Sequence, residues 1–270
     1  SGPLKMQLAM LSFALFTSSR RPGRTRLQLM PVIGESLVAL VTPMDDENKV
    51  DIGCLRELLE WQLECGTAGF VVLGTTGEAS TLSAAERETV MVEAAKVLEN
   101  RAPMVVGTGT IDTAATIAAT RRAAELGAAA SLVVTPYYVT PPQRGLIEHF
   151  TAVAAACDLP MILYNVPGRT GVDMHVDTVA ELAKHPRIIG IKEATGDVAR
   201  VPVLRELCGE DVVLVSGDDA TSLDFVAAGG DGVISVTTNI APRQMQQTMT
   251  LGKTDLAAAR EIDATLAALH

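Results

Sequence analysis

The chain has 270 residues, enough for one large domain or two small ones, and 48% of them are hydrophobic, so a sizeable core is expected and a disordered chain is excluded. The net charge of −10 argues against nucleic acid as a partner, because phosphate binding needs a basic surface. Aromatic residues make up only 3%, whereas small and branched aliphatic residues abound, which favours parallel strands covered by helices. No apolar run reaches the roughly 18 residues of a membrane span, so no membrane partner is predicted.

Residues 1–34 differ from the rest of the chain because they contain five basic residues and no acidic one. This composition resembles a targeting peptide. An expression leader, suggested by Ser1-Gly2-Pro3, or translated upstream sequence are the alternatives. We therefore expect this segment to lie outside the folded domain.

The four cysteines are far apart and form no metal-binding or redox pattern. Such spacing is typical of a reduced, cytoplasmic protein. No metal site is predicted.

From Glu35 onward, short apolar runs alternate with stretches whose apolar residues recur every three or four positions. The runs predict strands at Leu37–Val41, Gly69–Leu73, Met104–Val106, Ala130–Thr135, Met161–Tyr164, Ile188–Lys192, Val212–Ser216 and Gly232–Val236. The intervening stretches predict helices at Ile52–Cys65, Ala84–Glu99, Thr113–Leu126, Gln143–Cys157, Val176–Ala183, Val198–Cys208, Ala220–Ala227 and Pro242–Leu251. Capping residues support several starts: Ser83 and Glu86 form a capping box, and Asp51 and Asp112 can cap the helices that follow them.

Eight strand–helix units in about 215 residues predict an α/β protein with a (β/α)8 TIM barrel. An open, doubly wound sheet is the alternative, but no glycine-rich dinucleotide fingerprint follows the first strand. The predicted organisation is a barrel over residues 35–254 and the start of a C-terminal helical region over residues 255–270.

Lys192 ends the sixth predicted strand and is followed by Glu193 and a turn. At the end of a buried strand, desolvation disfavours the ammonium and lowers the pKa of the lysine. A neutral amine is a nucleophile that can form a Schiff base with a carbonyl compound. The alternative is a side chain that extends to solvent or pairs with a carboxylate.

The active site of a barrel is built at the carboxyl ends of its strands. All three tyrosines of the chain, Tyr137, Tyr138 and Tyr164, follow or end predicted strands, as do the turn 74–77 and Arg169. Hydroxyl groups can relay protons, a glycine-containing turn can hold a carboxylate, and the planar guanidinium can hold a second one. Packing tyrosines, a simple tight turn and a surface arginine are the respective alternatives. Glu193 is expected to orient backbone or to pair with a neighbour, and Asp218 and Asp219 are expected to cap the next helix.

Several strings together resemble the dihydrodipicolinate synthase and N-acetylneuraminate lyase family of pyruvate-dependent class I aldolases. They are Val38-Ala39-Leu40-Val41-Thr42-Pro43, Gly74-Thr75-Thr76-Gly77-Glu78, Val134-Thr135-Pro136-Tyr137-Tyr138, Leu163-Tyr164-Asn165-Val166-Pro167-Gly168-Arg169-Thr170-Gly171, Gly190-Ile191-Lys192-Glu193-Ala194-Thr195-Gly196, Ser216-Gly217-Asp218-Asp219 and Gly232-Val233-Ile234-Ser235-Val236. The resemblance runs in register from about residue 35 to the end.

The resemblance implies that pyruvate condenses with L-aspartate 4-semialdehyde, through a Schiff base on Lys192, to give 4-hydroxy-tetrahydrodipicolinate in lysine and diaminopimelate biosynthesis. It implies no cofactor, and a homo-oligomer, a dimer or tetramer, of the cytoplasm or plastid. The implied roles are a proton relay of Tyr164, Thr75 and Tyr138, the last reaching into a neighbouring subunit, and substrate binding by Thr76, Arg169, Gly217 and Ile234.

Three departures from the family pattern qualify the resemblance. Family members usually continue for some fifty residues of helix beyond the point that corresponds to His270, so the helical extension is expected to be largely missing. Val139 stands where the family often has asparagine. Ile111 and Ala115 stand where lysine-inhibited members have polar residues, which predicts weak or no inhibition by lysine. A different 2-keto acid aldolase, or a non-catalytic barrel that binds a keto acid, remain alternatives.

Overall fold

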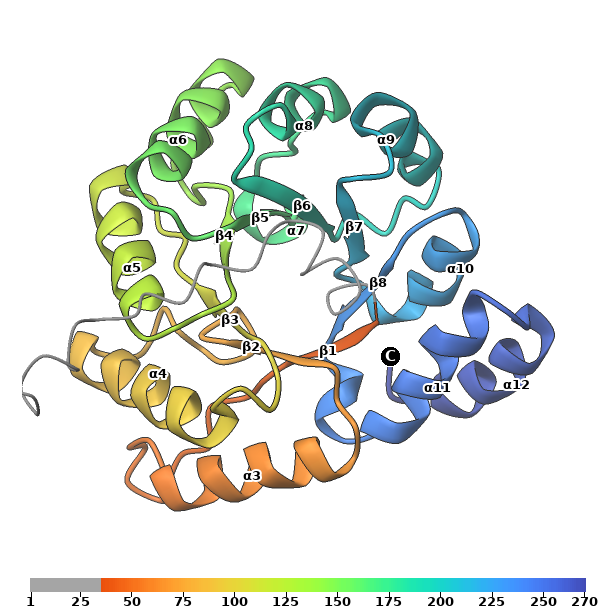
Figure 1. Ribbon diagram of the computed structural model, residues 1–270, viewed down its shortest axis with the longest axis horizontal. Helices are drawn as coiled ribbons and strands as arrows, with labels where there is room; N and C mark the ends of the chain where they lie inside the picture. The colour runs from red at the N-terminus through yellow and green to blue at the C-terminus, as the bar shows by residue number, and fades with distance from the viewer. Residues whose placement is uncertain (1–34) are drawn as a thin grey trace, which may run out of the picture.

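Eight parallel strands close into a barrel in which each strand pairs with the next and β8 pairs with β1 (Figure 1). The computed structural model describes residues 35–270, so the predicted leader of residues 1–34 lies outside the described residues. The strands are β1 (Ser36–Ala39), β2 (Gly69–Val72), β3 (Met104–Gly107), β4 (Ala130–Val134), β5 (Met161–Asn165), β6 (Ile188–Glu193), β7 (Val213–Ser216) and β8 (Gly232–Ser235). The predicted barrel is confirmed, and the open-sheet alternative is wrong.

A helix follows each strand and returns the chain to the opposite end of the barrel, so that the helices surround the strands (Figure 1). The long helices are α3 (Ile52–Glu64), α4 (Ala84–Leu98), α5 (Thr113–Glu125), α6 (Gln143–Ala156), α8 (Val176–Ala183), α9 (Arg200–Cys208), α10 (Ser222–Ala227), α11 (Pro242–Gly252) and α12 (Leu256–Leu266). The predicted capping box of α4 is present, since Ser83 and Glu86 exchange hydrogen bonds. Asp51 and Asp112 cap α3 and α5 as expected.

The strands are apolar on both faces because both faces are covered. Successive side chains of a strand point to opposite faces. In β5, Ile162 and Tyr164 belong to the cluster inside the barrel, whereas Met161 and Leu163 pack with Phe150 and other residues of the surrounding helices. This alternation determines which residues of each strand can reach the barrel interior.

The helix α12 packs on α11, outside the ring of helices (Figure 1). Its Leu266 joins a cluster with Met245 and Met249 of α11 and Val233 of β8. The expected helix near residues 255–269 is therefore present. No helix among residues 35–270 is long and apolar enough to cross a membrane.

Three short elements at the carboxyl ends of strands were not predicted from the sequence. They are the four-residue helix α7 (Pro167–Thr170) and the 3-10 turns η1 (Asp219–Thr221) and η2 (Thr237–Asn239). Each follows a strand directly, so each places polar residues at the mouth of the barrel. They form part of the candidate site.

Candidate active site

Lys192 is a buried amine in β6, only 5% exposed. It forms no ion pair with a carboxylate among residues 35–270 at the distances usual for such pairs. Burial lowers its pKa to about 8, an effect that the positive charge of Arg169 increases and the negative charge of Asp219 opposes. Burial therefore makes this amine more often neutral than an exposed lysine, as the sequence predicted.

Tyr164 is the nearest aromatic neighbour of Lys192. The two residues are direct partners in the pairing of β5 with β6, and the Lys192 Nζ lies 4.5 Å from the centroid of the tyrosine ring. Burial raises the pKa of Tyr164, while its hydrogen-bonding neighbour Thr75 and the charge of Arg169 act in the opposite direction. The phenol is thus protonated and can act as a proton donor beside the amine.

A cavity of about 570 Å³ lies at this end of the barrel and is lined by Thr75, Tyr137, Tyr164 and Arg169. It extends outward between α4 and α5, where Met91 belongs to its wall. Lys192 does not line this cavity. Its nitrogen lies against the ring of Tyr164, and Tyr164 lines the cavity. The cavity is large enough for small organic acids.

The turn after β2 carries the two adjacent threonines of the predicted site. The Thr42 hydroxyl donates to the Gly77 carbonyl at 2.7 Å, and the Glu78 amide donates to the Thr75 carbonyl at 3.0 Å. These bonds fix the turn at the mouth of the barrel. Thr75 is exposed and lines the cavity, whereas Thr76 is half-buried.

Gly217, directly after β7, packs tightly against Lys192. A Cβ atom at Gly217 would lie 2.7 Å from Cε of Lys192 and 2.7 Å from Cβ of Ala194, closer than real Cβ atoms approach. Only glycine therefore leaves room for the lysine side chain at this position. Ile234 of β8, 1% exposed, lies in the same interior cluster as Tyr164.

Tyr138 is not brought to the cavity by this chain. Its side chain is 89% exposed, and its φ of 69° lies in the left-handed region that non-glycine residues seldom adopt. Arg169, on α7, is exposed and lines the cavity. Of the eight predicted site residues, Lys192, Tyr164, Thr75, Arg169, Gly217 and Ile234 lie together, Thr76 lies in the adjoining turn, and Tyr138 lies apart.

A buried polar network supports β5 and β6 from the side opposite Lys192. Asn165 donates to Asp173 at 2.7 Å and to both oxygens of Glu193 at 3.2 and 3.3 Å. Arg200 pairs with Glu193 at 3.1 Å and with Asp173 at 2.9 Å. Burial raises the pKa of Glu193. The expectation that Glu193 orients backbone or pairs with a neighbour is confirmed, since it pairs with Arg200 and accepts from the Thr195 amide at 2.9 Å.

Asp218 and Asp219 have different roles, although the sequence predicted that both cap the next helix. Asp218 caps η1 by accepting from the Thr221 amide at 3.2 Å. Asp219 instead accepts the amides of Val236 and Thr237, each at 2.9 Å, so the prediction for Asp219 is wrong. The reason is that a carboxylate at the end of β7 lies beside the end of β8, a contact that local sequence does not reveal.

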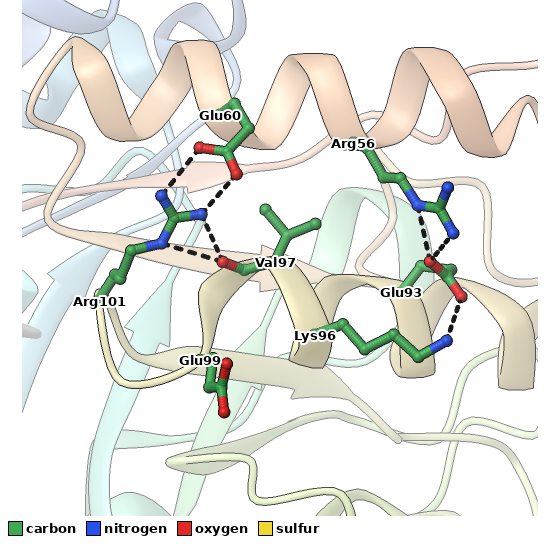
Figure 2. Close-up of a pocket in the computed structure, with 7 residues that line it drawn as sticks. All are labelled: Arg56, Glu60, Glu93, Lys96, Val97, Glu99 and Arg101. Atoms are coloured by element: carbon green, nitrogen blue, oxygen red, sulfur yellow. Dashed lines mark hydrogen bonds and ion pairs between the residues drawn. The ribbon is translucent and has the colours of Figure 1, made fainter.

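A second hollow of about 500 Å³ lies on the outer surface between α3 and α4 (Figure 2). Glu93 binds both Arg56 and Lys96, and Arg101 binds Glu60 through two hydrogen bonds. These paired charges link the two helices and leave no cation there without a partner. No group of histidine, cysteine or acidic residues among residues 35–270 could hold a metal ion.

The fold and the site define the class of the protein: a (β/α)8 barrel with a buried, partly neutral lysine at its mouth. Residues 33–270 match the family described as the Dihydrodipicolinate synthetase family, and the chain belongs to it. A 4-hydroxy-tetrahydrodipicolinate synthase of Alcanivorax borkumensis is 48% identical over 242 residues, which are 88% of this chain and 82% of the relative.

Other relatives agree. A 4-hydroxy-tetrahydrodipicolinate synthase of Shewanella frigidimarina is 52% identical over 211 residues, 78% of this chain and 72% of the relative. The crystal structure of a chloride-inhibited dihydrodipicolinate synthase from Acinetobacter baumannii, complexed with pyruvate, superimposes with a TM-score of 0.87 at 46% identity. The match covers 88% of this chain and 82% of that chain.

Proposed function

We propose that this chain is a 4-hydroxy-tetrahydrodipicolinate synthase, a lyase that condenses pyruvate with L-aspartate 4-semialdehyde in lysine and diaminopimelate biosynthesis. The observation that carries the proposal is the buried Lys192, with its pKa lowered to about 8, beside the phenol of Tyr164. The names of the relatives and the pyruvate in the Acinetobacter baumannii structure support the choice of substrates.

The neutral Lys192 nitrogen attacks the C2 carbonyl of pyruvate and forms a C–N bond. The carbonyl oxygen takes up protons and leaves as water, so that a cationic imine remains. This imine withdraws electrons, C3 loses a proton, and the resulting enamine attacks the aldehyde carbon of the second substrate. The amino group of the condensed intermediate then attacks C2, which is still bound to Lys192. This closes the ring and releases the lysine, so one water is lost overall.

Each proton transfer needs a group near the nitrogen. Tyr164 is proposed to donate to the departing oxygen, which its raised pKa and its hydrogen bond to Thr75 at the cavity wall support. Tyr138 would complete the relay from a second subunit, which suits its 89% exposure in one chain. Thr76 is proposed to hold the pyruvate carboxylate, with Gly217 and Ile234 forming the wall beside it.

Reductive trapping tests the imine directly. Incubation with pyruvate and sodium borohydride should attach a carboxyethyl group to Lys192, as peptide mass spectrometry would show. Omission of pyruvate is the control. A chain that gives no adduct is a non-catalytic keto-acid-binding barrel at most, and the proposed function is then rejected.

Arg169 is proposed to bind the carboxylate of L-aspartate 4-semialdehyde, because it lines the cavity with a planar guanidinium. Arg169→Ala should raise the KM for this aldehyde steeply, on the order of 10²-fold, and leave pyruvate trapping intact. An unchanged KM would favour the alternative of an aldolase that acts on a different 2-keto acid.

A homo-oligomer, a dimer or tetramer in the cytoplasm, is part of the proposal. If Tyr138 acts in the neighbouring subunit, the inactive variants Tyr138→Phe and Lys192→Ala should partly restore each other's activity when mixed and allowed to exchange subunits. Sedimentation of the unmodified protein gives the assembly. A fully active monomer would exclude the shared site.

Weak inhibition by lysine also stays a prediction. Ala115 belongs to the cavity wall, and Ile111 is 45% exposed nearby in sequence. Neither side chain can bind an ammonium group. Steady-state rates with millimolar L-lysine should stay close to the uninhibited rate, and strong inhibition would contradict the prediction.

A further inference from the structure

Asp219 has an unusual set of contacts at the mouth of the barrel. It starts η1 directly after β7, yet its Oδ2 accepts the backbone amides of Val236 and Thr237, beyond the end of β8, at 2.9 Å each. Two amide donors on one carboxylate oxygen hold the carboxylate in a defined position. Asp219 therefore links two neighbouring strand ends and carries a fixed negative charge.

The other oxygen of Asp219 is buried but has no hydrogen-bond partner among the described residues. A buried charged oxygen without a donor is costly unless a positive charge lies nearby. The amide bonds to Val236 and Thr237 account for the link between the loops, but not for this second oxygen. A nearby cation would account for it.

Lys192 is a buried basic side chain on the neighbouring strand, β6. Its strand pairs with β7, Lys192 opposite Val215, and the backbone at Gly217, two residues before Asp219, lies against the lysine side chain. The negative charge of Asp219 favours the protonated form of this amine. No ion pair joins the two groups directly, so the interaction acts through space.

The other ionisable groups around Lys192 cannot replace Asp219. Arg169, on α7, has the same sign as the ammonium and disfavours it. Tyr164, on β5, keeps its proton, since burial raises its pKa. Glu193, the next residue in β6, points to the other face and is paired with Arg200. From β8, Ile234 belongs to the interior cluster that contains Tyr164, and it is uncharged.

We propose that Asp219 is a positioning residue that holds a fixed negative charge toward the Lys192 nitrogen and stabilises the cationic imine formed there. This inference rests on the proposed function, because the imine is its intermediate. The same carboxylate keeps the ends of β7 and β8 together. Its hydrogen bonds to two backbone amides therefore fix the position of the charge.

The test is Asp219→Asn, since an amide oxygen can still accept the two backbone donors while the charge is lost. The rate of trapping by pyruvate and sodium cyanoborohydride is measured by intact mass from pH 6 to pH 9. The half-maximal pH should fall by about 0.5–1 unit, because the amine loses its counter-charge. The KM for pyruvate should rise about 3- to 10-fold, because the cationic imine is less stable.

The matched control is Asp218→Asn, which removes one charge from the adjacent position but only weakens the cap of η1. Its half-maximal pH should equal that of the unmodified chain. Asp219→Ser serves if the asparagine variant does not fold, because a hydroxyl also accepts amide donors without carrying charge, and the same downward shift is expected.

The outcomes separate the two proposals. If the unmodified chain forms no adduct, the proposed function fails. If it forms the adduct but the uncharged variants at position 219 keep its half-maximal pH and its KM for pyruvate, the role of Asp219 is overturned and the residue only links two loops. A purely structural role would lower thermal stability without moving the pH profile.

Discussion

Two regions of the molecule each contain a lysine and a glutamate: the outer surface between α3 and α4, and the mouth of the barrel at β6. The two regions differ in how exposed these side chains are and in how they are paired. Lys96 is 63% exposed and bound to Glu93, whereas Lys192 is 5% exposed and unpaired with any described carboxylate. Hydrogen bonds from Lys96 and Arg56 lower the pKa of Glu93 (Figure 2). Burial raises the pKa of Glu193, against the effect of Arg200.

The difference shows that a high density of charge does not by itself identify an active site. On the outer surface, flexible cationic side chains cover one carboxylate and remain in contact with water, so they stabilise the ionised form of Glu93. In the barrel, a single amine is desolvated, and the carboxylate next to it in sequence, Glu193, is paired with Arg200. The unpaired, buried group is the one whose chemistry changes.

The largest expected effect comes from removing each lysine in turn. Lys192→Ala should abolish adduct formation and lower kcat on the order of 10⁴-fold or more, because no lysine among residues 35–270 lines the cavity and could replace it. Lys96→Ala, which breaks only a surface pair, should leave kcat within about twofold. A Lys192 variant that retained substantial turnover would contradict the comparison.

Tyr164→Phe should lower kcat by about 10²- to 10³-fold, since it removes a proton donor and leaves the ring in place. The ring still packs against Lys192, so pyruvate binding should change less than turnover. Separate measurement of kcat and KM for pyruvate checks this. A change confined to KM would mean that the hydroxyl binds substrate but transfers no proton.

Removal of each glutamate sharpens the contrast in stability. Glu193→Ala should lower the free energy of unfolding by about 4 kcal/mol, because Asn165 and Arg200 lose a buried partner. Glu93→Ala should lower the free energy of unfolding by a clearly smaller amount, because Arg56 and Lys96 return to water. Urea unfolding of both variants measures the difference, and equal losses would refute it.

The pH dependence of stability should also distinguish the two lysines. The pKa of Lys192 is lowered from 10.5 to about 8 by folding, so between these values the unfolded chain binds more protons than the folded chain. Stability should therefore rise with pH across this window, by roughly 3 kcal/mol from this group. Lys192→Met should lack the rise, and Lys96→Met should keep it, as urea unfolding from pH 7.5 to pH 10 would show.

The sequence was sufficient for the barrel, because apolar runs and helical periodicity alternate eight times and strand ends of a barrel share one rim. It also led to Lys192, whose place after a buried run is a local property. The links of Asn165 to Glu193 and of Asp219 to Thr237 could not be predicted, since they join residues from different strand–helix units. The four-residue helix α7 is too short to produce a periodic signal.

The surroundings of the Tyr138 ring could not be predicted from the sequence for a different reason. The residue is 89% exposed, so few contacts within this chain determine where its ring lies. Local patterns specify the turn that carries it, but not what its ring meets.

The alternation of side chains along β6 places a strict limit on changes in chain length. Lys192 and Glu193 point to opposite faces, so inserting or deleting one residue within the strand would exchange the two: a carboxylate would enter the cavity side and an amine would face Arg200. Loops between helices and strands can accommodate such indels during evolution. We therefore expect natural length variation in this lineage to be absent from β6 and to occur on the opposite rim of the barrel.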